Sequence, residues 1–132
     1  MKKLLPFLLA TLIVGLFTLP AVAQRPTRIA FKRGARSAVV SGTMSSYRSA
    51  RTYVIRVRKG QRLTTEPIGE TNPVSIWITS PDGSSFGDDL DLSCHSRREV
   101  FPAARGDYIL KVQECQKADP WRGRFRFRVT VR

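Results

Sequence analysis

The chain has 132 residues, with 23 Lys and Arg against 10 Asp and Glu, and its formal net charge is +13. A charge of this size favours anionic surfaces and polymers as partners. The single histidine and two cysteines are too few, and wrongly spaced, for an ordinary zinc site.

Residues 1–23 have the pattern of a secretory signal peptide. Two lysines precede the apolar run Leu4–Leu19, and an Ala-Val-Ala cleavage pattern follows it. The run is shorter than the about 20 residues of a membrane span, so we expect no integral membrane segment after cleavage. An uncleaved membrane anchor is the alternative. The predicted organisation is a signal peptide (1–23) and one binding domain (24–132), located in the periplasm or secreted.

Removing the two lysines of the leader lowers the net charge from +13 to +11. Export separates the protein from nucleic acid, so we expect no nucleic-acid partner. Envelope polysaccharide, anionic lipid or an acidic protein patch are the expected anions.

Short runs of alternating apolar and polar residues, separated by Gly, Pro, Asn and Asp, predict about eight strands and no amphipathic helix. The predicted strands are Thr27–Lys32, Ser37–Met44, Arg51–Arg58, Gln61–Glu66, Val74–Thr79, Glu99–Phe101, Tyr108–Glu114 and Arg122–Val131. This pattern predicts an all-β fold, a jelly-roll-like two-sheet β-sandwich. A closed barrel is the alternative.

The stretch Arg51–Thr65 organises this pattern. Tyr53, Ile55 and Val57 alternate with mostly polar residues, which is typical of a strand with one buried face. Gly60 supplies the backbone freedom that a tight reversal needs, so the stretch predicts a β-hairpin.

Cys94 and Cys115 both lie in the exported part of the chain, where oxidising conditions favour pairing. A disulfide closing a loop of about 20 residues would stabilise the fold by roughly 3 kcal/mol. Two free buried thiols are the alternative.

Three acids, Asp88, Asp89 and Asp91, lie close together in a predicted loop. Clustered carboxylates can hold calcium, but the spacing of an EF-hand is missing. We interpret them as an acidic surface loop facing Arg97 and Arg98, and we expect no metal.

His95 follows a cysteine, an arrangement that can support nucleophilic catalysis. The cysteine is expected to be oxidised, and no Gly-x-Ser-x-Gly turn or paired carboxylates accompany it. We interpret His95 as a surface residue and expect no catalytic residue, no cofactor and no enzymatic activity.

Arginines alternate along the last predicted strand, at positions 122, 124, 126 and 128. One interpretation is a solvated outer face that discourages pairing with other chains. The functional interpretation is an anion-binding face, which is strengthened if Arg56 and Arg58 lie beside these arginines in the same sheet. The candidate residues of this face are Arg56, Arg58, Arg124, Arg126 and Arg128.

Tyr47 and Trp121 occupy polar segments between strands. Aromatic side chains on such loops often anchor contacts with a partner, although they can also fold back onto the sandwich.

The order of motifs in the chain resembles the bacterial periplasmic inhibitors of g-type lysozyme. It also resembles, more loosely, the pre-peptidase C-terminal domains of secreted proteases. The motifs are FKRGARSAVVSG, then Tyr47, then RTYVIRVRKGQRL, SIWITSPDG and FPAARGDYILKV, from Ile29 to the C-terminus. The resemblance implies a jelly-roll-like β-sandwich without enzymatic activity.

In these inhibitors, loops at one end are understood to enter the substrate cleft of the lysozyme, so the resemblance implies a protein partner of that class. Ser41-Gly42 and Tyr47 match the Ser-Gly…Tyr segment of the family. The inhibitors also use basic residues before the last strand, where this chain reads CQKADPWRG without one-to-one spacing. The predicted partner-binding residues are Tyr47, Lys117, Trp121 and Arg122. The cysteine pair and the tryptophan depart from the family pattern.

Charge complicates this interpretation. Lysozymes are commonly basic, so a chain of charge +11 is repelled by them at long range. Inhibition then requires Arg or Lys side chains that meet the carboxylates of the cleft at short range. The alternative function is an envelope module that binds anionic polysaccharide or lipid through the arginine face.

Overall fold

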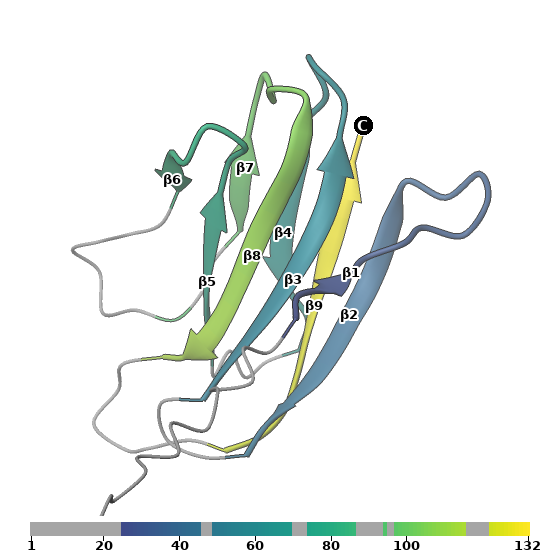
Figure 1. Cartoon of the computed structure of the whole chain (residues 1–132). Helices are drawn as coiled ribbons and strands as arrows, with labels where there is room; N and C mark the ends of the chain where they lie inside the picture. Colours follow the sequence, from purple (N-terminus) through teal and green to yellow (C-terminus); the bar gives the residue numbers. More distant parts are fainter. Residues whose placement is uncertain (1–24, 46–48, 70–73, 87–93, 95–96, 116–121) are drawn as a thin grey trace, which may run out of the picture.

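The computed structural model describes residues 25–45, 49–69, 74–86, 94, 97–115 and 122–132. In these ranges the chain forms nine β-strands in two sheets (Figure 1). The same ranges contain no helix that is long and apolar enough to cross a membrane. The leader predicted at 1–23 lies outside them, and its cleavage stays a prediction.

The strands divide into two separate sheets of different size. Sheet A has five strands, in the order β1 (Thr27–Arg28), β3 (Ala50–Val57), β8 (Gly106–Glu114), β5 (Val74–Thr79) and β6 (Ser85–Phe86). Sheet B has four, in the order β2 (Ser37–Met44), β9 (Gly123–Val131), β4 (Leu63–Pro67) and β7 (Arg98–Val100). Neighbouring strands are antiparallel, except for β1, which runs parallel to β3. The predicted β-sandwich is therefore confirmed, and the closed barrel is not the fold.

The core lies between the sheets and is built from the alternating faces that the sequence predicted. The buried apolar residues of β2, β3, β5, β8 and β9 are Val40, Met44, Tyr53, Ile55, Val57, Val74, Ile76, Ile78, Tyr108, Leu110, Val112, Phe125, Phe127, Val129 and Val131. Tyr53 of sheet A meets Phe125 and Phe127 of sheet B edge-on, with ring centroids 6.5 and 5.9 Å away. Such pairs stabilise a core by about 0.5–1.5 kcal/mol beyond the area they bury. These three rings join the two sheets.

The predicted hairpin over Arg51–Thr65 is wrong, although its turn is present. Gly60 has a φ of 85°, and the Gln61 N–H donates to the carbonyl of Arg58 at 3.2 Å. Beyond this turn the strands separate, because β3 pairs with β8 whereas β4 pairs with β9 and β7. The stretch therefore carries the chain from sheet A to sheet B. Its two apolar faces meet across the core and do not lie side by side.

Most other strand boundaries lie within two residues of the prediction, but two elements differ by more. The first strand, predicted over Thr27–Lys32, is limited to two residues, and Ile29 and Phe31 pack partly buried against the core. Ser85–Phe86, predicted within a loop, forms β6 and pairs with the end of β5. Short edge strands of this kind carry too few residues for alternation to reveal them.

The sandwich has two ends that differ in what closes them (Figure 1). We call the end formed by segments 58–62 and 101–105 the turn end. We call the opposite end, where β2 and β8 finish and β9 begins, the disulfide end. Met44 at the end of β2 pairs with Gly123 at the start of β9, which places these strand ends together.

Candidate functional site

The two segments expected to contact a partner begin and end at the disulfide end. Residues 45–49 connect β2 to β3, and residues 115–122 connect β8 to β9. Met44 pairs with Gly123, and Ala50 pairs with Gln113, so the flanking strand ends are neighbours. The sandwich therefore brings together the strand ends that flank two segments about 70 positions apart in the sequence.

Of the four predicted contact residues, Arg122 is described and its side chain is exposed. Tyr47, Lys117 and Trp121 lie outside the described residues, and their role stays a prediction.

Side-chain contacts close the connection between β2 and β3. The hydroxyl of Ser49 donates to Sδ of Met44 at 3.4 Å, and Arg51 Nε donates to the carbonyl of Thr43 at 3.0 Å. Met44 is buried, with 1% of its surface exposed. These contacts fix the points at which the chain leaves sheet B and enters sheet A.

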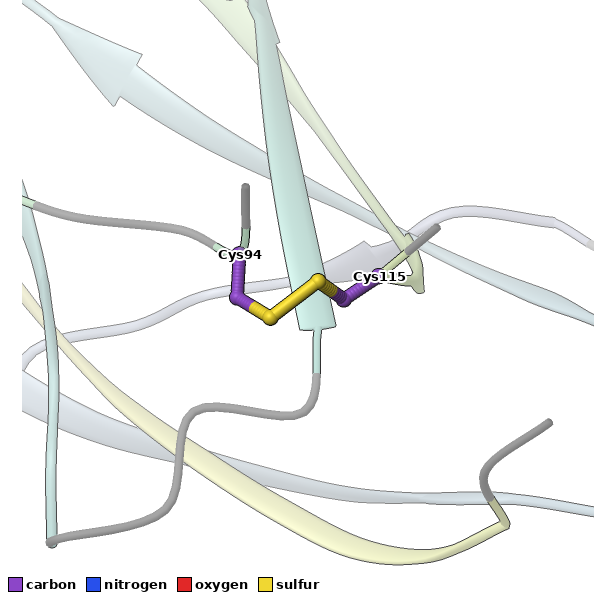
Figure 2. Close-up of a disulfide and its surroundings, with 2 residues drawn as sticks. All are labelled: Cys94 and Cys115. Atoms are coloured by element: carbon purple, nitrogen blue, oxygen red, sulfur yellow. A yellow bond between two sulfur atoms is a disulfide. The ribbon is translucent and has the colours of Figure 1, made fainter. Parts of the chain in front are cut away.

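Cys94 and Cys115 form the predicted disulfide, with their Cα atoms 5.0 Å apart (Figure 2). Cys115 directly follows β8 and is buried, whereas Cys94 comes from the segment between β6 and β7. The bond therefore attaches that segment to the disulfide end of sheet A.

In the Ser41-Gly42 motif, packing in the core explains why the second residue is glycine. A Cβ at Gly42 would lie 2.4 Å from the ring of Phe125 and 2.7 Å from the hydroxyl of Tyr53. Only glycine fits between these two rings. Ser41 is exposed on the outer face of sheet B, where it pairs with Arg126 of β9.

The predicted anion-binding face is wrong as a single surface. Arg124, Arg126 and Arg128 alternate with buried residues of β9 and lie on the outer face of sheet B. Arg56 belongs to β3 in sheet A, and Arg58 follows it, so the five arginines belong to opposite sides of the sandwich. The sequence pattern could not predict this separation. Alternation indicates which face of a strand is exposed to solvent, but not which sheet the strand belongs to.

Of the three exposed arginines of β9, Arg128 is also partly neutralised. Arg128 lies 3.2 Å from Glu66, its cross-strand neighbour on β4. Exposed pairs of this kind stabilise a fold by at most about 1 kcal/mol, but they lower the local positive potential.

The turn end holds a basic hollow that the sequence analysis only partly identified. Arg56, Val57, Arg58, Lys59 and Arg105 line an open space of about 430 Å³. Lys59 and Arg105 were missed as site residues. The signal in the sequence was that Arg58-Lys59 directly precedes Gly60 and that Arg105 directly precedes Gly106.

Local hydrogen bonds lower the pKa values of two aspartates, Asp107 and Asp82. Asp107 faces Arg28 at 3.1 Å and Arg56 at 3.6 Å. The hydrogen bond from Arg28 and the two positive charges hold the pKa of the Asp107 carboxyl below its usual value. In the turn after β5, the Ser80 hydroxyl and the Ser84 N–H lower the pKa of Asp82 to about 2.

The burial of Tyr53 raises the pKa of its phenol, because the charged form is disfavoured away from water. The ring acts as a packing element against Phe125 and Phe127.

In the part of the chain that the structure describes, no group of three or more His, Cys, Asp or Glu could hold a metal ion. Asp88, Asp89, Asp91 and His95 lie outside that part, so their interpretation is untested. Arg97, which was expected to face the acidic loop, lies 3.7 Å from Glu99.

At the level of sequence, no protein-family model matches the chain and no curated protein matches it. Solved structures are similar to it. PliG of Aeromonas hydrophila, a periplasmic inhibitor of g-type lysozyme, superposes with a TM-score of 0.63 at 19% identity, over 81% of this chain and 96% of its own. PliG of Salmonella Typhimurium, with the same description, gives 0.62 at 20% identity, over 83% of this chain and 100% of its own.

The pre-peptidase C-terminal domain of a Bacillus anthracis collagenase is also similar. Its TM-score is 0.51 at 14% identity, over 83% of this chain and 97% of its own. Both groups named by the sequence resemblance therefore share the fold of this chain.

Proposed function

We propose that this chain is an exported, non-catalytic periplasmic protein that inhibits a g-type lysozyme. The observation that carries the proposal is the fold shared with two such inhibitors over nearly the whole length of each. The matching Ser41-Gly42 motif, with its glycine wedged between two core rings, adds support from this chain's own residues.

The contact surface in this proposal is the disulfide end. Arg122 is exposed there beside the paired residues Met44 and Gly123. Tyr47 belongs to the segment between β2 and β3, and it supplies an aromatic surface with a hydroxyl group. Arg122 carries the positive charge that can meet a cleft carboxylate at short range.

Long-range electrostatics oppose this association if the lysozyme is basic, because the mature chain carries +11. Salt screens charges farther apart than about 8–10 Å but affects close pairs less. Raising the salt concentration should therefore speed association with a basic lysozyme, the opposite of the usual effect for complementary partners.

The test is an inhibition assay of the purified chain against a panel of g-type lysozymes. We expect stoichiometric loss of lytic activity, and we expect Tyr47→Ala and Arg122→Ala each to weaken inhibition by about tenfold or more, as contact anchors do. Arg36→Ala is the matched control, since Arg36 is an exposed arginine directly before β2, at the opposite end of that strand from Met44 and its partner Gly123.

Two results would contradict the proposal. One is the absence of inhibition across the panel. The other is equal loss of inhibition in the Arg122→Ala and Arg36→Ala proteins, which would place the contact somewhere other than the disulfide end.

A further inference from the structure

We propose that the turn end carries a binding site for a phosphate-bearing ligand, in the hollow of about 430 Å³ between Arg56, Arg58, Lys59 and Arg105. This volume lies in the range of about 300–1,000 Å³ that is usual for small-molecule sites. The site lies at the end opposite the proposed lysozyme contact and does not depend on it.

Two connections that are distant in sequence form this site together. The first joins β3 to β4, and the second joins β7 to β8. The Gly60 N–H donates to the carbonyl of Ala103, and the Ala103 N–H donates to the carbonyl of Gln61, both at 2.8 Å. This reciprocal pair of bonds holds the connection that carries Arg105 against the one that carries Lys59.

Buried groups fix the backbone on each side of the hollow. Val57 is fully buried, and the Arg58 N–H donates to Oε1 of Gln61 at 2.8 Å. On the other side, the Ala104 N–H donates to the hydroxyl of Tyr108 at 2.9 Å, and Tyr108 is 1% exposed. A ligand therefore meets a preformed frame, which lowers the entropy lost on binding.

Positive charge in the hollow exceeds the negative charge around it. Asp107 is the nearby carboxylate, and it is shared between Arg56 at 3.6 Å and Arg28 at 3.1 Å. Among the described residues, no ion pair joins Arg58, Lys59 or Arg105 to a carboxylate. These cations repel one another, and a bound anion would remove that repulsion.

The number and type of the cations favour phosphate over carboxylate. A phosphate monoester carries about −1.5 to −2 at pH 7 and offers three strong acceptor oxygens, whereas a carboxylate carries a single charge. Guanidinium groups bind phosphate oxygens in pairs, and a lysine adds a point charge. Two unpaired arginines and one unpaired lysine suit a doubly or multiply charged phosphate group.

The test is calorimetric titration of the purified chain with inorganic pyrophosphate, at an ionic strength held constant with sodium chloride. We expect saturable one-to-one binding and a pyrophosphate-dependent rise in Tm, because a ligand that binds only the folded state stabilises it.

A parallel arm uses phosphatidylcholine vesicles with and without phosphatidic acid. Binding in the vesicle arm alone would identify a lipid headgroup as the source of the phosphate, and binding of pyrophosphate would identify a free phosphate compound. Binding in neither arm would overturn the proposal.

Two double variants that lose the same charge distinguish specific binding of pyrophosphate from its non-specific attraction to a positively charged protein. Arg58→Gln with Arg105→Gln should lower the affinity for pyrophosphate by about tenfold or more. Arg124→Gln with Arg126→Gln, on the exposed face of β9, should change it by less than about twofold, since only screened long-range attraction is lost. Equal losses in the two variants would overturn the proposal. If the first variant does not fold, Lys59→Gln is compared instead with Arg124→Gln alone, since each removes one charge at an exposed position.

Discussion

The two ends of the sandwich are closed by different kinds of interaction. At the turn end, main-chain hydrogen bonds join separate connections: Gly60 to Ala103, and Arg62 to Arg132 in both directions at 2.7 and 3.1 Å. At the disulfide end, a covalent bond between Cys94 and Cys115 and side-chain contacts around Met44 do this work. The difference teaches that each end is held by its own local interactions, so each can be altered with little effect on the other.

The basic residues of the turn end differ in whether they are paired with other groups of the protein. Arg62 forms an ion pair with Glu99 and also lies over the ring of Phe101, 3.9 Å from its centroid. Such a cation–π contact at an exposed site stabilises by about 0.5–1 kcal/mol. Basic residues here therefore have two roles: some hold neighbouring connections together, and those around the hollow are available to a ligand.

The largest expected effect comes from removing the disulfide by Cys94→Ser with Cys115→Ser. The bond spans 21 positions, so its loss should lower the free energy of unfolding by about 3 kcal/mol. Urea denaturation measures this change. Lysozyme inhibition should weaken, whereas pyrophosphate binding at the turn end should persist in the folded protein.

Treatment of the unmodified protein with a reductant is the control for this variant and should reproduce its denaturation curve. If pyrophosphate binding is lost together with inhibition in the folded variant, the two ends are coupled and the comparison is wrong.

A smaller effect is expected from Tyr108→Phe. The change removes the hydroxyl that accepts the Ala104 N–H at 2.9 Å and should lower the free energy of unfolding by about 1 kcal/mol. Because this bond holds the connection that carries Arg105, pyrophosphate affinity should fall several-fold while inhibition stays unchanged. Tyr53→Phe makes the same chemical change in another buried tyrosine and should leave pyrophosphate affinity as it is. The idea of a preformed frame fails if Tyr108→Phe binds pyrophosphate as tightly as the unmodified protein.

The smallest effect concerns acid stability at the turn after β5. The pKa of Asp82 is lowered from 3.8 to about 2 by hydrogen bonds to its carboxylate. A lowered pKa in the folded state stabilises the protein above about pH 4, and this contribution is lost as the pH falls toward 2. Asp82→Asn keeps an acceptor oxygen but cannot titrate, so the decline of its Tm between about pH 4 and 2 should be less steep. A decline as steep as that of the unmodified protein would show that Asp82 contributes nothing to acid stability.

Alternation along single strands predicted most of the fold. The buried and exposed faces of β5, β8 and β9 agree with the sequence prediction, because burial on one face of a strand imposes a period of two whatever its partner is. The partner itself was not predictable in the same way. The turn at Gly60 has the residues of a hairpin, yet Arg62 and Gln61 form their next main-chain bonds with Arg132 and Ala103, which are far away in sequence.

The candidate site was predictable to a similar degree. The disulfide followed from the compartment and from the count of two cysteines. The basic hollow did not, because its cations come from β3 and from two connections that the pairing of β3 with β8 and of β4 with β7 brings together. A pattern read along the chain cannot show such a meeting of distant segments.

The place of β9 in sheet B has a consequence for how the protein can be assembled. This strand follows all the other described strands in the chain, yet it lies between β2 and β4 and supplies Phe125 and Phe127 to the core. Without it, β2 has no partner that joins it to β4, and the core lacks Phe125, Phe127, Val129 and Val131. The chain can therefore complete its second layer only after β9 has been synthesised, and this order of events would leave time for the export that we propose.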